Sequence, residues 1–366
     1  MAKRRLPRMV FDYIDGGADD EVTLRRSVSR FDDYELEHKV LTDVSNIDLS
    51  TSVLDQRRKL PFIISPTAAS RLFHPRQGER AVASAAYSAG VTYSASTLAS
   101  VALERLHAIN PDPKWFQVYV WKDRDLVEAV LERVRAAGFS TLILTVDTPI
   151  AGNRERDPRN GFSIPPRINL KTATQALARP GYLWDVATSP QIGPENFATS
   201  GSPQNIADFI NSQFDPSVSW EYAEWLKQVW GGPLILKGIS RLDDAKRAID
   251  LGADAIWISN HGGRQLDTAR PTIDVLANLA PALGGKIPIV LDGGVRRGSH
   301  IYKAVALGAD MVAIGRAYLF GLAAGGERGV SKAIQILRSE LERTMALTGC
   351  ASIDDIRSNR FLLLRR

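Results

Sequence analysis

The chain has 366 residues, of which 44% are hydrophobic and 24% charged, and this composition is typical of a globular protein that can bury a large core. Its net charge of +5 comes from 46 basic and 41 acidic residues. These charges are spread along the sequence, so no clustered basic surface for nucleic acid is expected. Cys350 is the only cysteine, which excludes an intrachain disulfide framework and a thiolate metal site and favours the cytoplasm.

Eight short apolar segments alternate with helical segments along the chain. The apolar segments are rich in β-branched and aromatic residues and are bounded by turn signals, which predicts strands. The strands are predicted at 61–66, 91–96, 115–120, 141–147, 233–237, 255–259, 287–292 and 311–314. The helices are predicted at 77–89, 99–109, 123–137, 241–251, 272–282, 298–307 and 317–347. Ser240 and Asp243 form a predicted capping signal for the helix at 241–251.

This alternation predicts an α/β fold, a (β/α)8 TIM barrel. Near-continuous apolarity indicates strands buried on both faces, as in a parallel sheet covered by helices. A doubly wound sheet is the alternative, but no dinucleotide-binding fingerprint accompanies the eight βα units. Residues 1–366 are therefore predicted to form a single domain with a long insertion after the fourth strand, at about 151–219. This insertion is interpreted as a lid, a membrane- or partner-docking loop or plain packing, and Tyr182–Trp184 within it are expected to be exposed.

Every predicted strand ends in hydrogen-bonding or charged residues. In a (β/α)8 barrel these ends meet at one mouth, where active sites lie. In chain order the tips carry Thr67 and Ala68, Ser94, Gln117 and Tyr119, Thr145 and Asp147, Lys237, Ser259 and His261 with Arg264, Asp292 to Gly294, and Gly315 with Arg316. This convergence predicts a functional site.

The last two tips predict a phosphate site. Residues 292–298, Asp-Gly-Gly-Val-Arg-Arg-Gly, follow the seventh strand, and Gly315 and Arg316 follow the eighth. At this position of the fold, glycine N–H groups and a helix N-terminus bind phosphate, and arginines such as Arg296 add a complementary charge. Lys237 is expected to point into the same mouth, where it would offset negative charge on a cofactor ring.

The sixth tip carries the side chain best suited to proton transfer near neutral pH, His261. Asp147, at the fourth tip, is the carboxylate expected to orient His261 and to stabilise its protonated form. Arg264 and Arg154 supply planar forks for a carboxylate. Together these residues predict a site for a small anionic substrate beside a phosphate-bearing cofactor.

Five segments carry a resemblance to a known family: 115–120, 144–149, 236–238, 259–267 and 292–298. The nine residues Ser-Asn-His-Gly-Gly-Arg-Gln-Leu-Asp at 259–267 are the most specific of them. The chain resembles the FMN-dependent L-2-hydroxy acid dehydrogenase and oxidase family, which includes glycolate oxidase, flavin-linked L-lactate dehydrogenase and mandelate dehydrogenase. Segments 213–217 and 230–233 look closest to the L-lactate dehydrogenase branch.

The resemblance implies a role for each matching residue. His261 would be the catalytic base, oriented by Asp147. The residues implied for the substrate carboxylate and hydroxyl are Tyr13, Tyr119, Arg154 and Arg264. The residues implied for FMN are Thr67, Ala68, Ser94, Gln117, Thr145, Lys237, Ser259 and Asp292, with Gly294, Arg296, Gly315 and Arg316 at its phosphate. No metal is expected.

The reaction implied by the resemblance is oxidation of a small, L-lactate-like L-2-hydroxy acid to the 2-oxo acid. Electrons would pass from FMN to an external acceptor, which is a quinone, a cytochrome or oxygen. The resemblance also implies a homo-oligomer, a tetramer, in the cytoplasm, with peripheral attachment to the inner membrane face left open. The substrate side chain, the acceptor and the choice between hydride and carbanion mechanisms stay open at this point.

Two residues depart from the family pattern. Ser96 is small where some members place a bulky residue over the substrate, and Ala68 stands where several membrane-linked dehydrogenases carry glycine. Three alternative functions are weighed against the main one: an oxygen-using oxidase of the glycolate or mandelate type, a barrel isomerase or aldolase that forms a Schiff base on Lys237, and a protein that only binds flavin or an anion.

Overall fold

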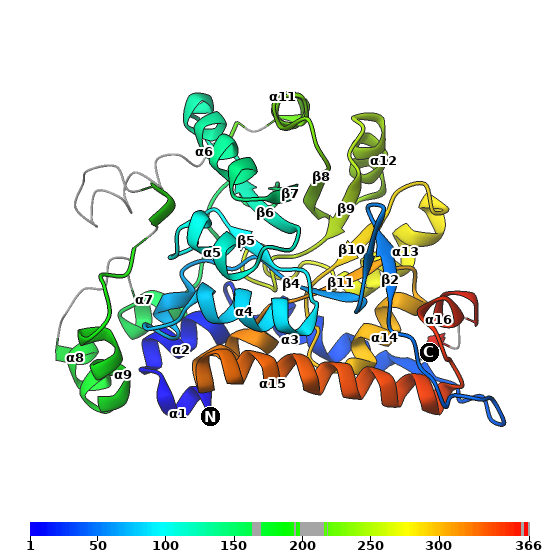
Figure 1. The fold of residues 1–366 in the computed structure, drawn as a ribbon, viewed down its shortest axis with the longest axis horizontal. Coiled ribbons are helices and arrows are strands. Elements are labelled where there is room, and N and C mark those ends of the chain that lie inside the picture. Colours follow the sequence, from blue (N-terminus) through cyan, green and yellow to red (C-terminus); the bar gives the residue numbers. More distant parts are fainter. Residues whose placement is uncertain (163–169, 194, 198–215, 218, 360–361, 365–366) are drawn as a thin grey trace.

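The structure is a computed structural model that describes residues 1–162, 170–193, 195–197, 216–217, 219–359 and 362–364. At its centre lies an eight-stranded parallel sheet with helices packed around it (Figure 1). Its strands are β4 Phe62–Ile64, β5 Ser94–Ser96, β6 Lys114–Tyr119, β7 Phe139–Thr145, β8 Leu234–Ile239, β9 Ala255–Ile258, β10 Ile289–Leu291 and β11 Met311–Ile314. From β5 to β11 each strand pairs with the next in sequence, and β11 pairs with β4.

The sheet closes on itself between its first and second strands. The amide of Ile64, on β4, donates to the carbonyl of Thr92 just before β5 at 3.0 Å, and Ile64 forms a parallel bridge with Tyr93. The predicted (β/α)8 barrel is therefore confirmed.

Side chains of each strand alternate between two cores, which explains the continuous apolar runs in the sequence. On β7, Ile143 belongs to the cluster that fills the barrel, whereas Leu142 and Leu144 belong to the cluster under the helices. A short hairpin of β2 Thr51–Val53 and β3 Gln56–Arg58 adds Val53 to the inner cluster. Trp115 and Trp257 are its largest members, so the barrel is packed and ligands can enter only at its mouth.

Around the barrel, the described residues form the seven predicted helices and one further helix, at 220–230, that was not predicted. They are α4 Glu79–Ala89, α5 Leu103–Ile109, α6 Arg124–Ala136, α11 Trp220–Trp230, α12 Leu242–Asp250, α13 Thr272–Leu283, α14 Gly298–Ala306 and α15 Arg316–Thr348. Before the barrel come α1 Ala2–Arg5, α2 Arg8–Asp15, α3 Val22–Ser29 and η1 Arg30–Asp33, and after it comes α16 Ile353–Asn359. The remaining strands, β1 Tyr34–Leu36 and β12 Leu362–Leu364, pair with each other.

One local prediction about helices was wrong, and one predicted helix contains an interruption. Helix α12 has Arg241 as its N-cap without a side-chain cap hydrogen bond, so Ser240 and Asp243 do not form the predicted capping pair. The closing helix α15 is interrupted at Gly325 and Gly326. Gly326 has φ +57, and a side chain there would overlap Gln77, so close packing on the loop before α4 demands glycine.

The insertion after β7 contains regular structure where it is described: α7 Arg156–Asn160, α8 Leu170–Leu177, α9 Pro180–Ala187 and the short η3 Glu195–Phe197. The expectation of exposed aromatic residues was half right. Trp184 is 65% exposed, but Tyr182 is 7% exposed, because its hydroxyl donates to the carbonyl of Leu72 at 2.8 Å. Residues 213–215, part of the lactate-branch resemblance, lie outside the described residues.

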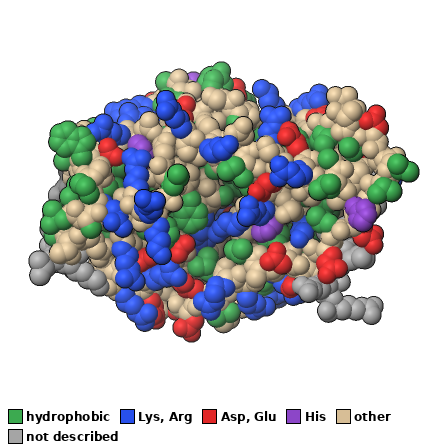
Figure 2. All heavy atoms as spheres, turned by 90° about the horizontal axis from the view of Figure 1, so that it is seen from below, with side chains coloured by type: hydrophobic (Ala, Val, Ile, Leu, Met, Phe, Trp, Pro, Cys, Tyr) green, Lys and Arg blue, Asp and Glu red, His purple; other side chains and the backbone are tan. Residues whose placement is uncertain are grey.

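The insertion packs against the N-terminal helices at one corner of the molecule (Figure 1). Figure 2 shows hydrophobic side chains gathered at the left-hand end, where α8 and α9 lie, and Lys and Arg side chains in a band beside them. In the described parts of the chain, no helix is long and apolar enough to span a membrane.

Candidate functional site

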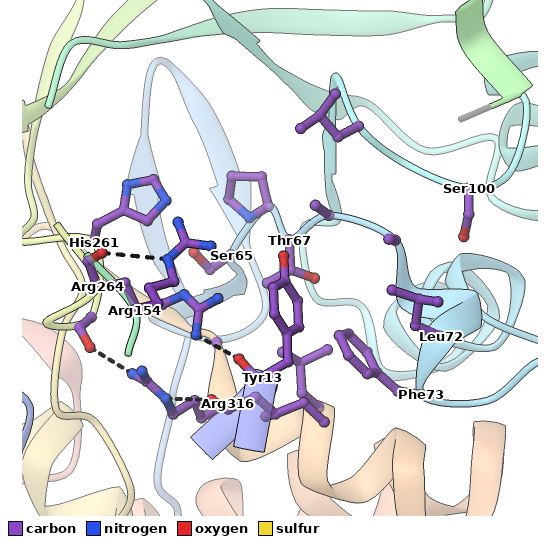
Figure 3. A pocket seen from close by; sticks show the side chains of 18 of the residues that line it. Tyr13, Ser65, Thr67, Leu72, Phe73, Ser100, Arg154, His261, Arg264 and Arg316 are labelled. Atoms are coloured by element: carbon purple, nitrogen blue, oxygen red, sulfur yellow. Dashed lines mark hydrogen bonds between the residues drawn. The ribbon is translucent and has the colours of Figure 1, made fainter. Parts of the chain in front are cut away.

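A cavity of about 1250 Å³ opens at the carboxyl ends of the barrel strands. All of the predicted site residues line it except Ser94, Asp147 and Ser259. Its two sides differ in chemistry (Figure 3): Arg154, His261 and the other labelled arginines lie on one side, and Leu72 and Phe73 on the other. The barrel therefore brings the predicted residues into one polarised site.

His261 is held in a strained conformation at the tip of β9. Its backbone φ is +55, a left-handed value that is uncommon for residues other than glycine and clusters at functional sites. Its amide donates to Ser259 Oγ at 3.0 Å, and Gly262 and Gly263 continue the left-handed turn. A Cβ on Gly263 would lie 2.7 Å from the amide of Leu24, so the turn packs directly on α3.

The imidazole of His261 faces the buried carboxylate of Asp147. Nδ1 of His261 lies 3.2 Å from Oδ1 of Asp147, as predicted from the sequence. Burial lowers the pKa of His261, and Asp147 only partly opposes this. Burial by itself would raise the pKa of Asp147, but the charge of Lys237, together with the hydrogen bond to His261, outweighs it and holds that pKa below its ordinary value. The free site therefore holds a neutral imidazole beside an ionised carboxylate.

Lys237 is tied into a buried chain of polar groups beside this pair. Its Nζ donates to Ser259 Oγ at 3.1 Å, and Ser259 Oγ donates to Asp292 Oδ1 at 2.7 Å. Asp292 also lies 3.7 Å from Lys237 Nζ and accepts from Trp257 Nε1 at 3.0 Å. Ser259 therefore does not line the cavity itself. It orients Lys237 and His261, which do.

The tips of β5, β6 and β7 share a second chain of hydrogen bonds. Ser96 Oγ donates to Gln117 Oε1, and Gln117 Nε2 donates to Thr145 Oγ1, each at 2.9 Å. Ser94 stands apart from the cavity lining, and its buried hydroxyl has no hydrogen-bond partner among the described residues. Beyond the end of β4, the hydroxyl of Thr67 contacts that of Tyr318.

Two arginines approach His261 from the loops beyond the strand tips. Arg264 Nη1 donates to the carbonyl of Tyr13 at 2.6 Å, and its guanidinium lies 4.7 Å from the centre of the Tyr13 ring. Arg154 Nε donates to the carbonyl of Arg264 at 3.5 Å. Burial and the charge of Arg154 lower the pKa of Arg264. Within the described parts of the chain neither arginine forms an ion pair, so a small anion would relieve their mutual repulsion.

Tyr13 and Tyr119 complete this side of the cavity. The Tyr13 ring is stacked between Phe162 and Phe73, with centroid distances of 4.4 and 6.1 Å. Burial raises the pKa of Tyr119 well above its ordinary value, so its phenol stays protonated and can donate a hydrogen bond. Both tyrosines therefore offer rigid hydroxyl groups near the two arginines.

The predicted phosphate end lies at the tips of β10 and β11. Gly293 and Gly294 have φ +92 and +81, and a side chain on Gly294 would overlap the carbonyl of Ser27. Gly315 is the N-cap of α15, and a Cβ built there meets nothing within 4 Å. The N–H groups at the start of α15 thus border the open cavity.

The two arginines of the phosphate end are bound differently. Among the described residues, Arg296 Nη1 donates only to the neighbouring Val295 carbonyl, at 2.8 Å, and burial lowers the pKa of Arg296. Arg316 donates to three backbone carbonyls, those of Ile14, Gly16 and Gly262, each at 2.8 Å. Three of its five N–H groups are thus committed, and it joins the phosphate end to the His261 turn (Figure 3).

The family model of the FMN-dependent dehydrogenases matches residues 2–362. The chain belongs to this family. It is 43% identical over 360 residues to an L-lactate oxidase from Nostoc sp., covering 97% of this chain and 94% of the relative. It is 39% identical over 363 residues to an L-lactate dehydrogenase from Ectopseudomonas mendocina, covering 98% and 95%.

A solved structure of the family superposes along the whole chain. The crystal structure of the monotopic membrane protein (S)-mandelate dehydrogenase matches with a TM-score of 0.95 and 37% identity, covering 99% of this chain and 96% of that one. The barrel is therefore arranged as in that enzyme.

The residues of the cavity fit FMN. Its volume exceeds the roughly 300–1,000 Å³ of a drug-sized ligand site, which leaves room for a cofactor and a small substrate together. Arg296 has no carboxylate within ion-pair distance among the described residues, and Gly315 leaves the space at the α15 N-terminus open. Lys237 and the hydroxyl of Thr145 are donors on the cavity wall. The family's cofactor is thus matched by an anion-binding end and a polar wall.

Several residues that support the site were not predicted from the sequence. Trp257 holds Asp292, and Tyr318 holds Thr67. His300 accepts from the amide of Arg296 at 3.3 Å while stacking flat on Phe31, with a centroid distance of 4.4 Å. Trp257 and Tyr318 lie within apolar runs, where the sequence signal was that of core residues.

Proposed function

We propose that this FMN-dependent dehydrogenase oxidises a small L-2-hydroxy acid to the corresponding 2-oxo acid and passes the electrons to an external acceptor. The observation that carries the proposal is the contact of His261 with Asp147 in one cavity with two arginines that lack carboxylate partners among the described residues. L-Lactate is the first substrate to test, because two similar relatives are named for lactate.

In this proposal Arg154 and Arg264 bind the substrate carboxylate. Their planar guanidinium groups match a carboxylate geometrically as well as electrostatically. Tyr13 and Tyr119 donate hydrogen bonds to the carboxylate and to the oxygen at C2. The substrate is thereby held in one orientation with its C2 group toward His261, which removes much of the entropic cost of reaching the transition state.

His261 acts as the base. Oxidation of a secondary alcohol to a carbonyl removes two electrons and two protons, and one proton must be taken up by a group on the enzyme. A neutral imidazole can accept it, and the carboxylate of Asp147 stabilises the imidazolium that results. FMN, when bound, supplies the two-electron acceptor.

The remaining residues are proposed to hold the cofactor. The ring would contact Thr67 and Ala68 and be held by Ser94, Gln117, Thr145 and Lys237, with Ser259 and Asp292 orienting Lys237. The phosphate would be held by Gly294, Arg296, Gly315 and Arg316. The cation of Lys237 would favour negative charge on the ring when it is reduced. This arrangement and the family membership favour the flavin hypothesis over a Schiff base on Lys237.

The proposal is tested by flavin reduction. Purified protein should be yellow, and its absorbance near the visible flavin maximum should bleach when L-lactate or a related L-2-hydroxy acid is added without oxygen. Reoxidation by oxygen, a quinone or a cytochrome then identifies the acceptor. A flavin-loaded protein that no L-2-hydroxy acid reduces would contradict the proposal.

Contact with a membrane surface is proposed for α8 and α9. Leu177 and Trp184 are 70% and 65% exposed, and the exposed basic residues Lys3 and Arg4 of α1 lie nearby, since Arg5 pairs with Asp185 of α9 at 2.8 Å. Exposed apolar side chains beside basic ones favour an anionic lipid surface. The proposed state is a cytoplasmic homotetramer that attaches peripherally.

A further inference from the structure

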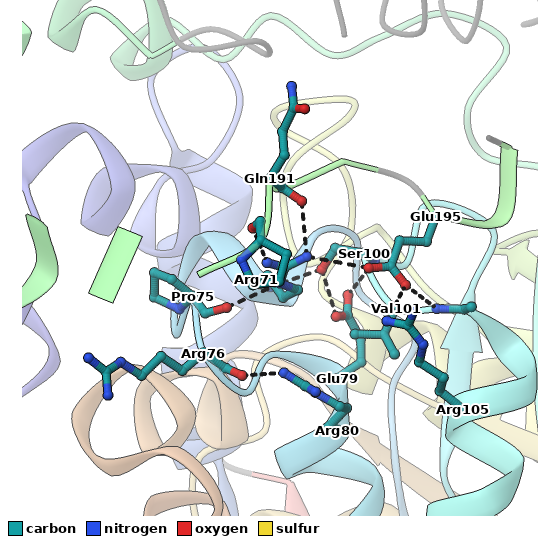
Figure 4. A network of polar contacts seen from close by, with 12 residues as sticks. Arg71, Pro75, Arg76, Glu79, Arg80, Ser100, Val101, Arg105, Gln191 and Glu195 are labelled. Atoms are coloured by element: carbon teal, nitrogen blue, oxygen red, sulfur yellow. Dashed lines mark hydrogen bonds and ion pairs between the residues drawn. The ribbon is translucent and has the colours of Figure 1, made fainter. Parts of the chain in front are cut away.

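A buried ionic network lies where the insertion crosses the loops that follow β4 and β5 (Figure 4). We call residues 190–193 and 195–197 the strap, because they run from α9 to η3 across these loops. The strap residues that line the cavity are Pro190, Gln191, Ile192, Gly193 and Glu195. The strap is therefore part of the wall of the site.

Arg71 holds the strap in place through hydrogen bonds and an ion pair. Its side chain is 3% exposed, and its guanidinium donates to the carbonyl of Gln191 at 3.1 Å, to that of Pro190, and to that of Pro75 at 3.1 Å. Nη1 also lies 3.5 Å from Glu195 Oε1. A buried guanidinium is stable only when its donors are satisfied, and most of these partners belong to the strap.

A buried carboxylate fixes the position of Arg71. Glu79 accepts from the amides of Ser70 and Ser100, each at 2.8 Å, and from Ser100 Oγ at 2.7 Å. Ser100 Oγ in turn accepts from the amide of Arg71 at 3.1 Å. These hydrogen bonds hold the loops after β4 and β5 together, and none of them involves the strap.

The strap also supplies the missing cap of a barrel helix. Helix α5 has Ala102 as its N-cap, which offers no side-chain acceptor. Glu195 Oε2 accepts from the amide of Ala102, and Asn196 Oδ1 accepts from that of Leu103, each at 3.1 Å. Because uncapped helix amides need partners, this contact ties the strap to the barrel at a second point.

The strap faces the apolar side of the cavity. Ile192 packs against the main hydrophobic core and lines the cavity together with Leu72 and Leu98. Leu72 lies across the cavity from the arginines that would bind the substrate carboxylate (Figure 3). A 2-hydroxy acid bound by its carboxylate there would direct its side chain toward this apolar wall.

We propose that Arg71 is a positioning residue that sets substrate preference by holding the strap, with Ile192, against the substrate's side chain. The inference rests on the proposed function for its substrate class. It assigns the site a preference for apolar side chains longer than methyl, because a methyl group would leave the Leu72–Ile192 wall uncontacted.

The test compares L-lactate with L-2-hydroxyhexanoate in the flavin-loaded enzyme. The wild type is expected to have the higher kcat/KM for L-2-hydroxyhexanoate. In Arg71→Met the ratio of the two kcat/KM values should shift at least tenfold toward L-lactate, through a higher KM for the longer acid, while kcat for L-lactate stays unchanged. Ile192→Ala should shift the ratio in the same direction without disturbing the Arg71 contacts.

Arg105→Ala is the matched control. Arg105 touches the same Glu195 at 3.2 Å, but its side chain is 64% exposed, so this pair contributes little and the ratio should stay within twofold of wild type. A ratio that is unchanged in both Arg71→Met and Ile192→Ala would overturn the inference.

Amide exchange separates this inference from the proposed function. In Arg71→Met the amides of Ala102 and Leu103 should exchange at least tenfold faster than in the wild type, because the strap no longer caps α5. Unchanged exchange at these amides would overturn the anchoring role of Arg71, whether or not the protein oxidises either acid. Failure of the wild type to be reduced by both acids would instead contradict the proposed function.

Discussion

At the scale of single residues, the chemistry of the site depends on one strained histidine and one buried carboxylate. The left-handed φ of His261 directs its imidazole to Asp147, 3.2 Å away, while Ser259 holds its amide. Oδ2 of Asp147 has no hydrogen-bond partner among the described residues. The charge of this carboxylate therefore acts mainly on His261 and Lys237, and the Lys237 cation lowers the pKa of Asp147.

Replacing Asp147 with Asn tests this pairing. The substitution keeps a hydrogen-bond acceptor but removes the charge that stabilises the imidazolium, so kcat should fall by on the order of 100-fold or more. The pH profile of kcat/KM provides the specific readout. In the wild type the loss of activity on acidification should lie below pH 6.5, since burial lowers the pKa of His261.

In Asp147→Asn this acid limb should move to still lower pH, because the carboxylate that raises the pKa of His261 is gone. Bound flavin, measured by absorbance, should stay near the wild-type amount. An acid limb at the wild-type position would mean that another group titrates there and that His261 is not the base.

At the scale of elements, the insertion divides into a buried and an exposed part. Tyr182 and the strap bind the barrel loops, whereas Leu177 and Trp184 project outward from α8 and α9. The N-terminal helices support this arrangement: the amide of Met9 on α2 donates to Gln175 of α8 at 2.9 Å. The contact between α2 and α8 thus fixes the position of the exposed apolar residues near the mouth of the cavity.

The variant Leu177→Ser/Trp184→Ser tests the proposed membrane contact. The wild type should sediment with vesicles that contain anionic phospholipid, and the double variant should lose most of this binding because two apolar anchors are removed. Ile336→Ser, on α15, is a matched control, since Ile336 is also an exposed apolar residue, at 43% exposed. Equal binding by the wild type and the double variant would contradict the proposed contact.

At the scale of the whole molecule, the N-terminal segment and the last βα units are joined through buried groups. His300 of α14 stacks on Phe31 of η1 and accepts from the amide of Arg296, and Lys303 donates to the carbonyl of Phe31 at 2.9 Å. Burial lowers the pKa of His300 from 6.5 to about 4. The folded protein thus holds His300 neutral where the unfolded chain would protonate it.

This difference predicts a pH dependence of folding. His300 contributes its full stability above pH 6.5, and that contribution is lost as the pH falls from about 6.5 to about 4, a loss on the order of 3 kcal/mol over the interval. His300→Asn keeps an acceptor near the Nδ1 position but cannot titrate. Its free energy of unfolding, measured with denaturant, should therefore fall less steeply between pH 6.5 and 4 than that of the wild type. Parallel slopes would contradict the prediction.

The sequence by itself determined the barrel fold and most of the residues that line the site. Apolar periodicity reports burial of each strand directly, and the barrel topology then brings every strand end to one mouth, so residues such as Lys237 and His261 could be assigned without coordinates. The same local signals predicted the glycine-rich phosphate end. The pairing of His261 with Asp147 followed from their positions on strands six and four.

Only the tertiary structure decided how these residues are held. Arg316 binds the carbonyl of Ile14 across 302 residues of sequence, and Arg71 binds that of Gln191 across 120. Backbone carbonyls are present at every residue, so the sequence carries no signal for such partners. For the same reason Tyr182 was expected at the surface, although its hydroxyl binds Leu72. Local patterns report burial and chain direction, whereas contacts between distant segments arise only when the barrel closes.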